Sequence, residues 1–238
     1  MVSLRYEINN TDPREKKRFI RAMFTSIVPS YDRLNRILSL GIDRLWRRSA
    51  MRLLGDMKGK RALDLCCGTG DLSRILHRQG VRAVSLDFCG EMVRRGIDAG
   101  NIRGAAVIAD ASVLPFADVS FDILTIAFGI RNIPDIDNFI DEARRVLESG
   151  GVLMILELTR PKNPVIGFLY SLYLEKILPL VGWLVSGERT AYRYLSRTIA
   201  TFIDPRELAE RFAKKGFTCR KFSKTFGIAT ILICEKKI

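Results

Sequence analysis

The sequence predicts an α/β fold in which helices cover both faces of a mainly parallel sheet. Short apolar runs typical of strands alternate with stretches whose apolar residues recur at helical spacing. Three of these runs finish at or near a carboxylate, and one is followed directly by a glycine-rich turn. Because parallel strands present their carboxyl ends at one edge of a sheet, the pattern favours a ligand site along that edge.

The expected elements alternate regularly through the centre of the chain. We expect strands at 61–66, 83–88, 105–110, 121–128 and 152–158, with helices at 71–80, 91–99 and 136–148 between them. A helix at 204–215 should follow, with Asp204 as its cap and Pro205 in the first helical position. Two closing strands, at 218–224 and 228–235, bring the expected sheet to seven strands.

Helical segments precede and interrupt this core. The spacing of Phe19, Ile20 and Met23 indicates an amphipathic helix in the segment 13–56. The apolar stretch 165–185 approaches membrane-spanning length, but two charged residues and a proline interrupt it. One or two amphipathic helices fit it better, and these would either cover the site or rest on a bilayer surface.

The chain therefore divides into four parts. We expect an N-terminal helical extension (1–56), a cofactor-binding core (57–161), a helical lid or membrane-facing insertion (162–203), and a closing helix with strands that complete the sheet (204–238).

The net charge of +13 is concentrated in the two flanks. Residues 1–56 carry 12 Lys and Arg against 6 Asp and Glu, and residues 162–238 carry 14 against 6, whereas the centre is nearly neutral. Such flanks favour anionic partners, either nucleic acid or an anionic membrane surface. A basic proteome or the charged surface of a thermophilic protein would give the same balance.

Terminal and cysteine patterns indicate the cellular setting. The N-terminus lacks the apolar core of a signal peptide. The five cysteines are irregularly spaced without a C-x-x-C pair, so we expect neither a zinc site nor a disulfide framework. We expect a reducing, cytoplasmic setting with buried free thiols; Cys89, near the ligand edge, could instead be reactive.

The segment 61–71 carries the most specific motif. Asp64 lies near the end of the first expected strand, and the turn 68–70 leads into a helix that begins near Asp71. The dinucleotide fingerprint fails, since Ser73 stands where its third glycine should be. An acid before the turn suits an ammonium or sulfonium cation better than a pyrophosphate. The motif therefore indicates S-adenosylmethionine as the cofactor.

The first part of the expected cofactor site comes from this motif. We expect Asp64 to face the methionine ammonium, directly or through water. Gly68 and Gly70 should let the backbone approach the cofactor closely, and Thr69 should add its hydroxyl or amide. Asp71 is more readily interpreted as a residue that begins the helix.

The following strands are expected to supply the rest of the cofactor site. Asp87, at the end of the second strand, is placed to accept both ribose hydroxyls. Asp110, after the third, should accept the adenine amino group while the Ala111 N–H meets the ring. Phe88 and Ala127 complete the expected set. Each acid could instead serve as a helix cap or turn residue.

Four blocks of residues are specific as an ordered set. They are Tyr31-Asp32-Arg33-Leu34-Asn35 with Ser39, Asp43 and Trp46; Phe128-Gly129-Ile130-Arg131-Asn132; Arg145 to Gly151 running on to Glu157-Leu158-Thr159; and Tyr192-Arg193-Tyr194-Leu195. Together they resemble the ubiquinone/menaquinone biosynthesis C-methyltransferase family over about residues 17–236. The resemblance implies a Rossmann-like seven-stranded class I methyltransferase fold with N-terminal helices and a helical cap inserted after the fifth strand. It also implies methyl transfer from S-adenosylmethionine to a ring carbon of a polyprenylated quinol.

Three positions depart from the pattern of this family. Asp43 stands where the family usually has histidine, Glu148-Ser149 replaces Lys-Pro, and Ala127 replaces a serine seen in some members. The first of these could alter contacts with the substrate.

The expected reaction is an in-line displacement at a sulfonium, which needs positioning and a water-poor pocket but no metal. The quinol carbon becomes nucleophilic when the neighbouring hydroxyl loses its proton. Arg131, after the fourth strand, could stabilise the resulting phenolate, with Asn132 and Tyr31 as orienting partners and water near Arg131 as proton acceptor. Alternatively, Arg131 forms an ion pair with Asp135 or Asp137.

Other candidate residues are less specific. The sole histidine, His77, falls on the first core helix away from the strand ends, so we do not expect a histidine base. Tyr192 and Tyr194 could line the substrate pocket or pack within the cap.

We therefore expect a quinol C-methyltransferase, converting demethylmenaquinol to menaquinol or its ubiquinone-pathway counterpart, that works at the inner face of the membrane. Its expected partners are the quinol, an anionic membrane surface and a second copy in a homodimer. A phospholipid amine or another lipid is the alternative acceptor, and RNA is a further one. Nucleic acid is not expected, because the chain lacks an Asn/Asp-Pro-Pro-Tyr-like motif and regular basic-aromatic interleaving. Acids at three strand ends argue against a non-catalytic binding protein.

Overall fold

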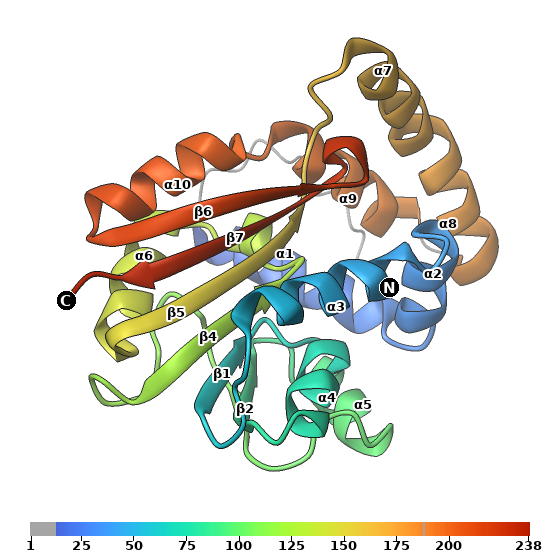
Figure 1. Cartoon of the computed structure of the whole chain (residues 1–238). Helices are drawn as coiled ribbons and strands as arrows, with labels where there is room; N and C mark the ends of the chain where they lie inside the picture. The colour runs from blue at the N-terminus through green and yellow to red at the C-terminus, as the bar shows by residue number, and fades with distance from the viewer. Residues whose placement is uncertain (1–12, 188) are drawn as a thin grey trace.

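The computed structural model describes residues 13–187 and 189–238, and a seven-stranded sheet forms the centre of this part of the chain (Figure 1). The strand order is β3-β2-β1-β4-β5-β7-β6. Strands β1 to β5 pair in parallel, and β7 runs antiparallel between β5 and β6. The strands are β1 (Arg61–Leu65), β2 (Arg82–Asp87), β3 (Ala106–Ile108), β4 (Phe121–Ala127), β5 (Leu147–Leu158), β6 (Phe217–Lys224) and β7 (Ala229–Lys236). The predicted fold class, with its closing antiparallel pair, is confirmed.

Helices flank this sheet and cap one of its edges. Before the sheet come α1 (Pro13–Ile27), α2 (Tyr31–Leu38) and α3 (Ile42–Leu54); α4 (Asp71–Arg78), α5 (Gly90–Asp98), η1 (Ile130–Asn132) and α6 (Ile136–Val146) follow within the core. The cap consists of α7 (Pro164–Leu172), η2 (Tyr173–Ile177), α8 (Leu178–Ser186) and α9 (Arg189–Thr201), and α10 (Pro205–Lys214) and η3 (Thr225–Gly227) lie around the last strands. Residues 1–12 are outside the described chain, so the expectation of no signal peptide stays a prediction.

Three apolar clusters hold these layers together. One face of the sheet packs Leu124 and its neighbours against Phe139 of α6 and Phe212 of α10. The other face packs against α3 and α4, through residues such as Met51. A third cluster joins α1, α5 and the cap beyond the sheet, with Phe19 among its members. The N-terminal helices and the cap thus share a hydrophobic core of their own.

Strand lengths differ from expectation at two places. Helix α6 ends at Val146, and β5 begins at once with Leu147 rather than at residue 152. Gly150 adopts φ 73°, and the β4–β5 register shifts between Phe121 and Ile123, so the strand passes through a bulge. Edge strand β3 stops at Ile108, which leaves Asp110 in the loop beyond it.

The cap contains more helix than the sequence indicated. Helices α7 and α8 run on from one another through the π-helical turn η2, and α9 then folds back against α8. Pro179 has no N–H and its ring clashes with the preceding turn, which accounts for the widened geometry there. Gly182 allows the close crossing, because a Cβ at this position would lie 2.2 Å from the Tyr192 ring.

One expectation about the cysteines was wrong. Cys219 of β6 and Cys234 of β7 form a disulfide, with Cα atoms 4.0 Å apart. The two residues stand directly opposite one another in the antiparallel ladder. Their pairing depends on strand register, which the irregular spacing in the sequence does not reveal. Cys66, Cys67 and Cys89 are free thiols.

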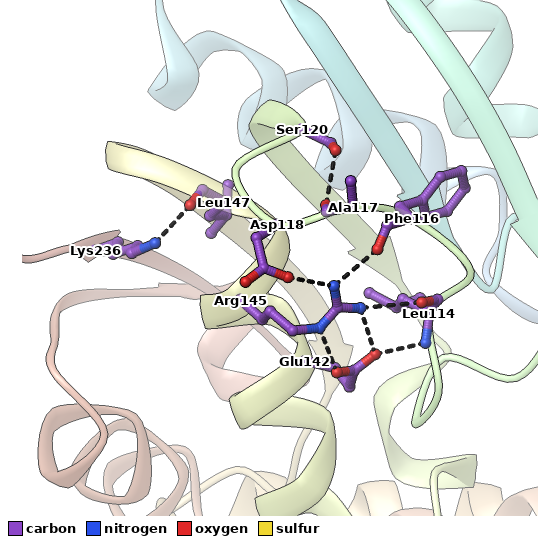
Figure 2. A network of polar contacts seen from close by, with 9 residues as sticks. All are labelled: Leu114, Phe116, Ala117, Asp118, Ser120, Glu142, Arg145, Leu147 and Lys236. Carbon is purple, nitrogen blue, oxygen red and sulfur yellow. Dashed lines mark hydrogen bonds and ion pairs between the residues drawn. The ribbon is translucent and has the colours of Figure 1, made fainter.

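Arg145 braces the loop between β3 and β4, as Figure 2 shows. Its guanidinium donates to the carbonyls of Phe116 at 2.7 Å and Leu114 at 3.0 Å, and pairs with Asp118 at 2.8 Å. Glu142 accepts from Arg145 Nε at 2.7 Å and from the Leu114 N–H at 2.6 Å. This loop begins at the residues that follow β3, so the brace fixes the far end of the predicted cofactor site.

Replacement of Arg145 should therefore destabilise the fold. Arg145→Met leaves two loop carbonyls without this donor and leaves Glu142 with only the Leu114 N–H, so we expect a loss of about 2 kcal/mol in the free energy of unfolding. Urea denaturation measures this change. Arg211→Met is the matched control, since Arg211 makes exposed ion pairs on α10 and should shift the midpoint much less. Equal shifts for the two variants would contradict the role assigned to the brace.

Candidate functional site

Strand order reverses between β1 and β4, and the predicted site residues gather at the carboxyl ends of these two strands. In an open parallel sheet this switch point is where ligands bind. Cys66 after β1 and Phe128 after β4 both adopt the left-handed region, at φ 51° and 60°. A Cβ on Gly129 would lie 2.5 Å from that of Cys66, so a glycine is needed for the close approach of the two loops.

A first cavity of about 360 Å³, counting the part open to solvent, lies at this switch point. It is lined by Tyr31, Arg47, Asp64, Cys66, Cys67, Gly68, Thr69, Asp71, Leu72 and Ala127. Five residues predicted from the sequence are thereby brought together, namely Tyr31, Asp64, Gly68, Thr69 and Ala127. Gly70 does not line it but forms the left-handed turn, at φ 79°, from which α4 begins.

Asp64 is the buried acid of this cavity. Only 1% of the residue is exposed, and its carboxylate accepts hydrogen bonds from Ser73 Oγ at 2.5 Å and Thr125 Oγ1 at 2.8 Å. Burial raises the pKa of Asp64 to about 6, although the two hydroxyl donors work in the opposite direction. A cation bound beside the carboxylate would offset this desolvation, so the cavity suits an ammonium group.

Asp87 lies beside the glycine turn rather than in the cavity. Its carboxylate accepts from the backbone N–H of Gly68 at 2.9 Å and of Cys89 at 2.8 Å. Burial raises the pKa of Asp87, and these N–H groups partly counteract the effect. A carboxylate has about four acceptor positions, so Asp87 can hold the turn and still accept ligand hydroxyls.

A second cavity of about 400 Å³ continues along the sheet edge toward β3. It is lined by Lys17, Ile20, Cys66, Leu86, Phe88, Ala109, Asp110, Ala111, Asn132, Ile133 and Pro134. Cys66 lines both cavities, so together they form one track across the ends of β1, β2 and β3. The predicted residues Phe88, Asp110 and Ala111 meet here, in a mostly apolar slot suited to a flat ring.

The N-terminal helices lie over this track. Lys17 of α1 forms an ion pair with Asp110, and Thr69 Oγ1 donates to Asp32 of α2 at 2.5 Å. Burial alone would raise the pKa of Asp110, but Lys17 and the Ser112 N–H outweigh it and hold the pKa below its usual range. The Thr69 hydroxyl, expected to serve the cofactor, is thus already bonded to protein. Neither contact is predicted from the sequence, because both join residues that lie far apart in the chain.

A third, largely apolar cavity of about 680 Å³, part of it open to solvent, lies beneath the cap. It is lined by Tyr31, Asn35, Leu38, Ser39, Asp43, Trp46, Arg47, Phe128, Arg131, Leu158, Tyr170, Tyr173, Leu174, Leu178, Leu195, Ile199 and Ile228. Tyr31 and Arg47 also line the first cavity, so the apolar space meets the cofactor track at these two side chains.

Arg131 lies in this apolar cavity, but its partner differs from the alternatives considered. It donates to the Phe128 carbonyl at 2.8 Å and forms a buried ion pair with Glu157 of β5. Asp135 instead caps α6, and Asp137 lies near Arg211. Sequence reasoning missed Glu157 because the pair depends on the adjacency of η1 and β5.

Asn132 lines the second cavity but not the apolar cavity that contains Arg131, and it accepts a hydrogen bond from Tyr194 of α9 at 3.1 Å. Tyr194 and Tyr192 are both buried in the third apolar cluster, and both also line a neighbouring cavity of about 420 Å³. Each tyrosine therefore packs within the cap and lines a cavity. The His77 ring accepts from the Arg103 N–H at 3.3 Å. In the part of the chain that the structure describes, no group of three or more His, Cys, Asp or Glu side chains could hold a metal ion.

The outer surface of the cap is apolar. One helical stretch of the described chain, Pro164–Ser186, is long and apolar enough to cross a membrane, judged by length and composition alone. Only 17% of its most apolar window is buried in the protein. Its exposed large residues are Val165, Phe168, Leu169, Leu172, Ile177, Leu180, Trp183 and Leu184, which we call the outer cap surface.

Comparison with known proteins identifies relatives along nearly the full length. A model of the ubiE/COQ5 methyltransferase family matches residues 10–236. The chain is 41% identical over 219 residues to a demethylmenaquinone methyltransferase of Thermus thermophilus, covering 90% of this chain and 100% of that relative. It is 38% identical over 231 residues to one of Deinococcus radiodurans, covering 95% and 96%. A ubiquinone/menaquinone biosynthesis C-methyltransferase of Geobacter sulfurreducens is 41% identical over 232 residues, covering 93% and 90%.

Solved structures share the fold at low sequence identity. A SAM-dependent methyltransferase of Thermotoga maritima, described as a possible histamine N-methyltransferase, has a TM-score of 0.65 at 18% identity, covering 91% of this chain and 99% of that one. A putative S-adenosyl-L-methionine-dependent methyltransferase of Methanococcus maripaludis has a TM-score of 0.64 at 18% identity, covering 90% and 94%.

The raised pKa of Asp64 predicts a pH dependence of stability. Its folded pKa of about 6 exceeds the ordinary value, so the native state holds the proton more tightly than the unfolded chain does. The stabilisation that results from this tighter proton binding is present at low pH and is lost as the pH rises toward 7. Between pH 5 and pH 7 the group should reduce the free energy of unfolding by about 1 kcal/mol.

Urea unfolding of wild type and Asp64→Asn at pH 5 and pH 7 measures this effect. The pH-dependent difference should be smaller in Asp64→Asn by about that amount. Asp122→Asn is the control: the Arg61 partner lowers the pKa of Asp122, so its carboxylate is ionised throughout this range. An unchanged difference in Asp64→Asn would contradict the raised pKa.

Proposed function

Because this chain belongs to the ubiE/COQ5 methyltransferase family, it is an S-adenosylmethionine-dependent methyltransferase, and we propose that it methylates a ring carbon of a polyprenylated quinol. The conversion would be demethylmenaquinol to menaquinol or the ubiquinone-pathway equivalent. The names of its relatives support this substrate class. The observation that carries the proposal is the large apolar cavity, which meets the cofactor track at Tyr31 and Arg47.

The cofactor track fits S-adenosylmethionine from end to end. When bound, this cofactor supplies an electrophilic methyl group on a sulfonium. Asp64 would hold the methionine ammonium, and Asp87 would accept the ribose hydroxyls beside the turn that it organises. In the second cavity, Asp110 and the Ala111 N–H would bind the adenine edge, while Phe88 supplies apolar contact.

The apolar cavity would hold the quinol ring. Its largely apolar walls limit contact with water and supply aromatic surfaces, and Tyr31 stands where the ring would approach the cofactor track. Arg131 contributes positive charge that favours a developing phenolate, although the buried Glu157 carboxylate offsets part of it. Tyr31 would orient the ring, whereas Asn132 does not line this cavity and lies in the two neighbouring ones. This arrangement favours reaction on a carbon beside an ionisable hydroxyl.

The outer cap surface would bring the enzyme to its lipid-soluble substrate. Helix α8 packs against α2, whose exposed side includes Arg33, Arg36 and Ile37. Exposed Arg44 and Arg48 follow on α3. Apolar residues flanked by arginines are typical of a surface that rests on an anionic bilayer, and the inner side of the same cap lines the cavity. A polyprenyl tail could thus remain in lipid while the ring enters. The homodimer stays a prediction.

The direct test of the function is methyl transfer in vesicles. Purified enzyme with labelled S-adenosylmethionine should methylate reduced demethylmenaquinol or a reduced demethyl-benzoquinol, each presented in liposomes. Asp87→Asn should weaken cofactor binding at least tenfold, since one charge-assisted acceptor is lost. Cofactor binding by the wild type without methylation of either ring would reject the quinol as substrate.

The membrane proposal predicts a specific loss of vesicle binding. Phe168→Glu combined with Leu184→Glu removes two of the most exposed apolar side chains of the outer cap surface and adds two negative charges. Partition onto vesicles containing phosphatidylglycerol should fall at least tenfold, because each apolar side chain contributes about 1.5–3 kcal/mol when buried. Co-sedimentation measures this partition.

A matched control variant is available on another helix. Ile97 of α5 is 50% exposed, and Ile97→Glu combined with Val113→Glu makes the same chemical change away from the cap. This control should bind vesicles nearly as well as the wild type. Equal binding by the cap variant and the wild type would exclude the outer cap surface as the membrane contact.

A further inference from the structure

Asp43 is the one carboxylate among the described residues that line the apolar cavity, and no histidine lines it. The residue belongs to α3 and is 5% exposed. Its carboxylate accepts hydrogen bonds from Ser39 Oγ at 2.9 Å and from Arg47 at 2.6 Å. An acid is therefore held, with defined partners, in the wall of a cavity that is otherwise largely apolar.

Arg47 links this acid to the cofactor track. Its guanidinium stands 4.9 Å from the centre of the Phe128 ring, and the side chain lines both the apolar cavity and the first cavity. The side chain is 11% exposed, and its buried Nε has no hydrogen-bond acceptor within the described protein. The buried Nε of Arg131, which lines the same apolar cavity, also lacks an acceptor, and an oxygen atom of a bound ligand would satisfy such donors.

The other titratable groups around Asp43 are poor proton acceptors. Tyr31 of α2, Tyr170 of α7 and Tyr173 of η2 line the same cavity, and burial raises the pKa of each, that of Tyr173 to about 12. These phenols stay protonated at neutral pH. On the remaining side, Arg131 of η1 is a cation that cannot accept a proton.

Two further acids lie near the cavity but do not line it. Glu157 of β5 is bound behind Arg131, and Asp64 of β1 belongs to the first cavity, where it faces the cofactor track. Neither is placed against a ring in the apolar space. The group in that wall that can accept a proton is therefore Asp43.

We propose that Asp43 accepts the proton from the hydroxyl of the quinol and that Arg47 holds the resulting phenolate oxygen at the entrance to the cofactor track. This inference rests on the proposed function and names the residues that activate its substrate. Ser39 orients the acid from the opposite side. The position is the one at which the related family usually has histidine, another side chain that accepts protons.

Apart from the quinol, the methyl donor and water, the proposed steps require no reagent. The quinol O–H bond breaks, its proton passes to a carboxylate oxygen of Asp43, and the electron pair stays on the phenolate oxygen beside Arg47. That pair makes the adjacent ring carbon nucleophilic; this carbon bonds to the methyl group while the sulfonium takes the electrons of the C–S bond. The ring carbon then loses its hydrogen as a proton to water, and the C–H electron pair restores the aromatic ring and the phenolate. The phenolate oxygen finally recovers the proton from Asp43. One proton is released overall.

The test compares Asp43→Asn with Asp43→His in the full-length enzyme, using reduced demethylmenaquinol in liposomes. Asp43→Asn keeps a hydrogen-bond acceptor but cannot take a proton, and kcat should fall at least 100-fold. Asp43→His should recover activity to within about tenfold of wild type at pH 8. Its kcat should fall below pH ~6.5 as the imidazole is protonated, whereas the wild type should remain active there.

If Asp43 and Arg47 form only a structural ion pair, the two variants should rank in the opposite order of activity. An amide can still accept from Arg47, so Asp43→Asn would keep its rate, and Asp43→His would lose it by repulsion. Either Asp43→Asn within threefold of wild type, or Asp43→His as inactive as Asp43→Asn, would overturn the proposal. Binding of S-adenosylhomocysteine by both variants verifies that they are folded.

Asp122→Asn is the matched control, because Asp122 also pairs with an arginine but lies beside Arg61 at the start of β1, away from the cavity. It should leave kcat and its pH profile unchanged.

The wild type separates the two proposals. Wild-type enzyme that binds cofactor but methylates no quinol would overturn the function and the role of Asp43 together. Active wild type with an unaffected Asp43→Asn would overturn the role of Asp43 alone.

Discussion

The burial of two carboxylates at the switch point of the sheet is the constraint on which the rest of the site depends. Asp64 and Asp87 lose most of their hydration, so the protein must supply donors. Ser73 and Thr125 serve Asp64, and Ser73 is the residue that replaces the third glycine of a dinucleotide fingerprint. The residue that breaks the dinucleotide fingerprint therefore supplies a hydrogen-bond donor to Asp64. The raised pKa values show that these donors do not fully replace water, which leaves the acids suited to a cationic or hydroxyl-bearing ligand.

The two basic flanks convert this polar edge into a closed, apolar reaction space. Helices α1 and α2 lie over the track through Lys17 and Asp32, and the cap completes the third apolar cluster. The stretch from α7 to α8 is largely apolar on both sides, because Leu174 lines the cavity and Phe168 is exposed, although exposed Glu175 and Lys176 interrupt the outer side. A helix that is apolar all round normally lies in a core or in lipid. Here one side has protein as its apolar neighbour, whereas the other side has none among residues 13–187 and 189–238.

The sequence predicted what depends on local pattern. Alternating apolar runs predicted the seven strands, and the acids near their ends predicted which edge holds Asp64 and Asp110, because strand direction in a parallel sheet leaves no choice. What it missed depends on contacts between residues far apart in the chain. The pairing of Arg131 with Glu157 spans 26 residues. Cys219 and Cys234 meet only through strand register, and nothing local distinguishes them from free thiols.

The two arginines of the apolar cavity illustrate why placement rather than residue type decides a role. Arg131 is neutralised by a buried carboxylate and holds the Phe128 carbonyl, so much of its charge is used within the protein. The Nε of each arginine lacks an acceptor within the described protein, but of the two only Arg47 also lines the first cavity of the cofactor track. Its partner Asp43 lines the same apolar cavity and accepts a hydrogen bond from Arg47. An anionic acceptor loses its charge on taking a proton, so the phenolate then becomes the main anion facing Arg47. Arg47 can therefore stabilise the carboxylate of Asp43 before proton transfer and the phenolate oxygen of the substrate after it.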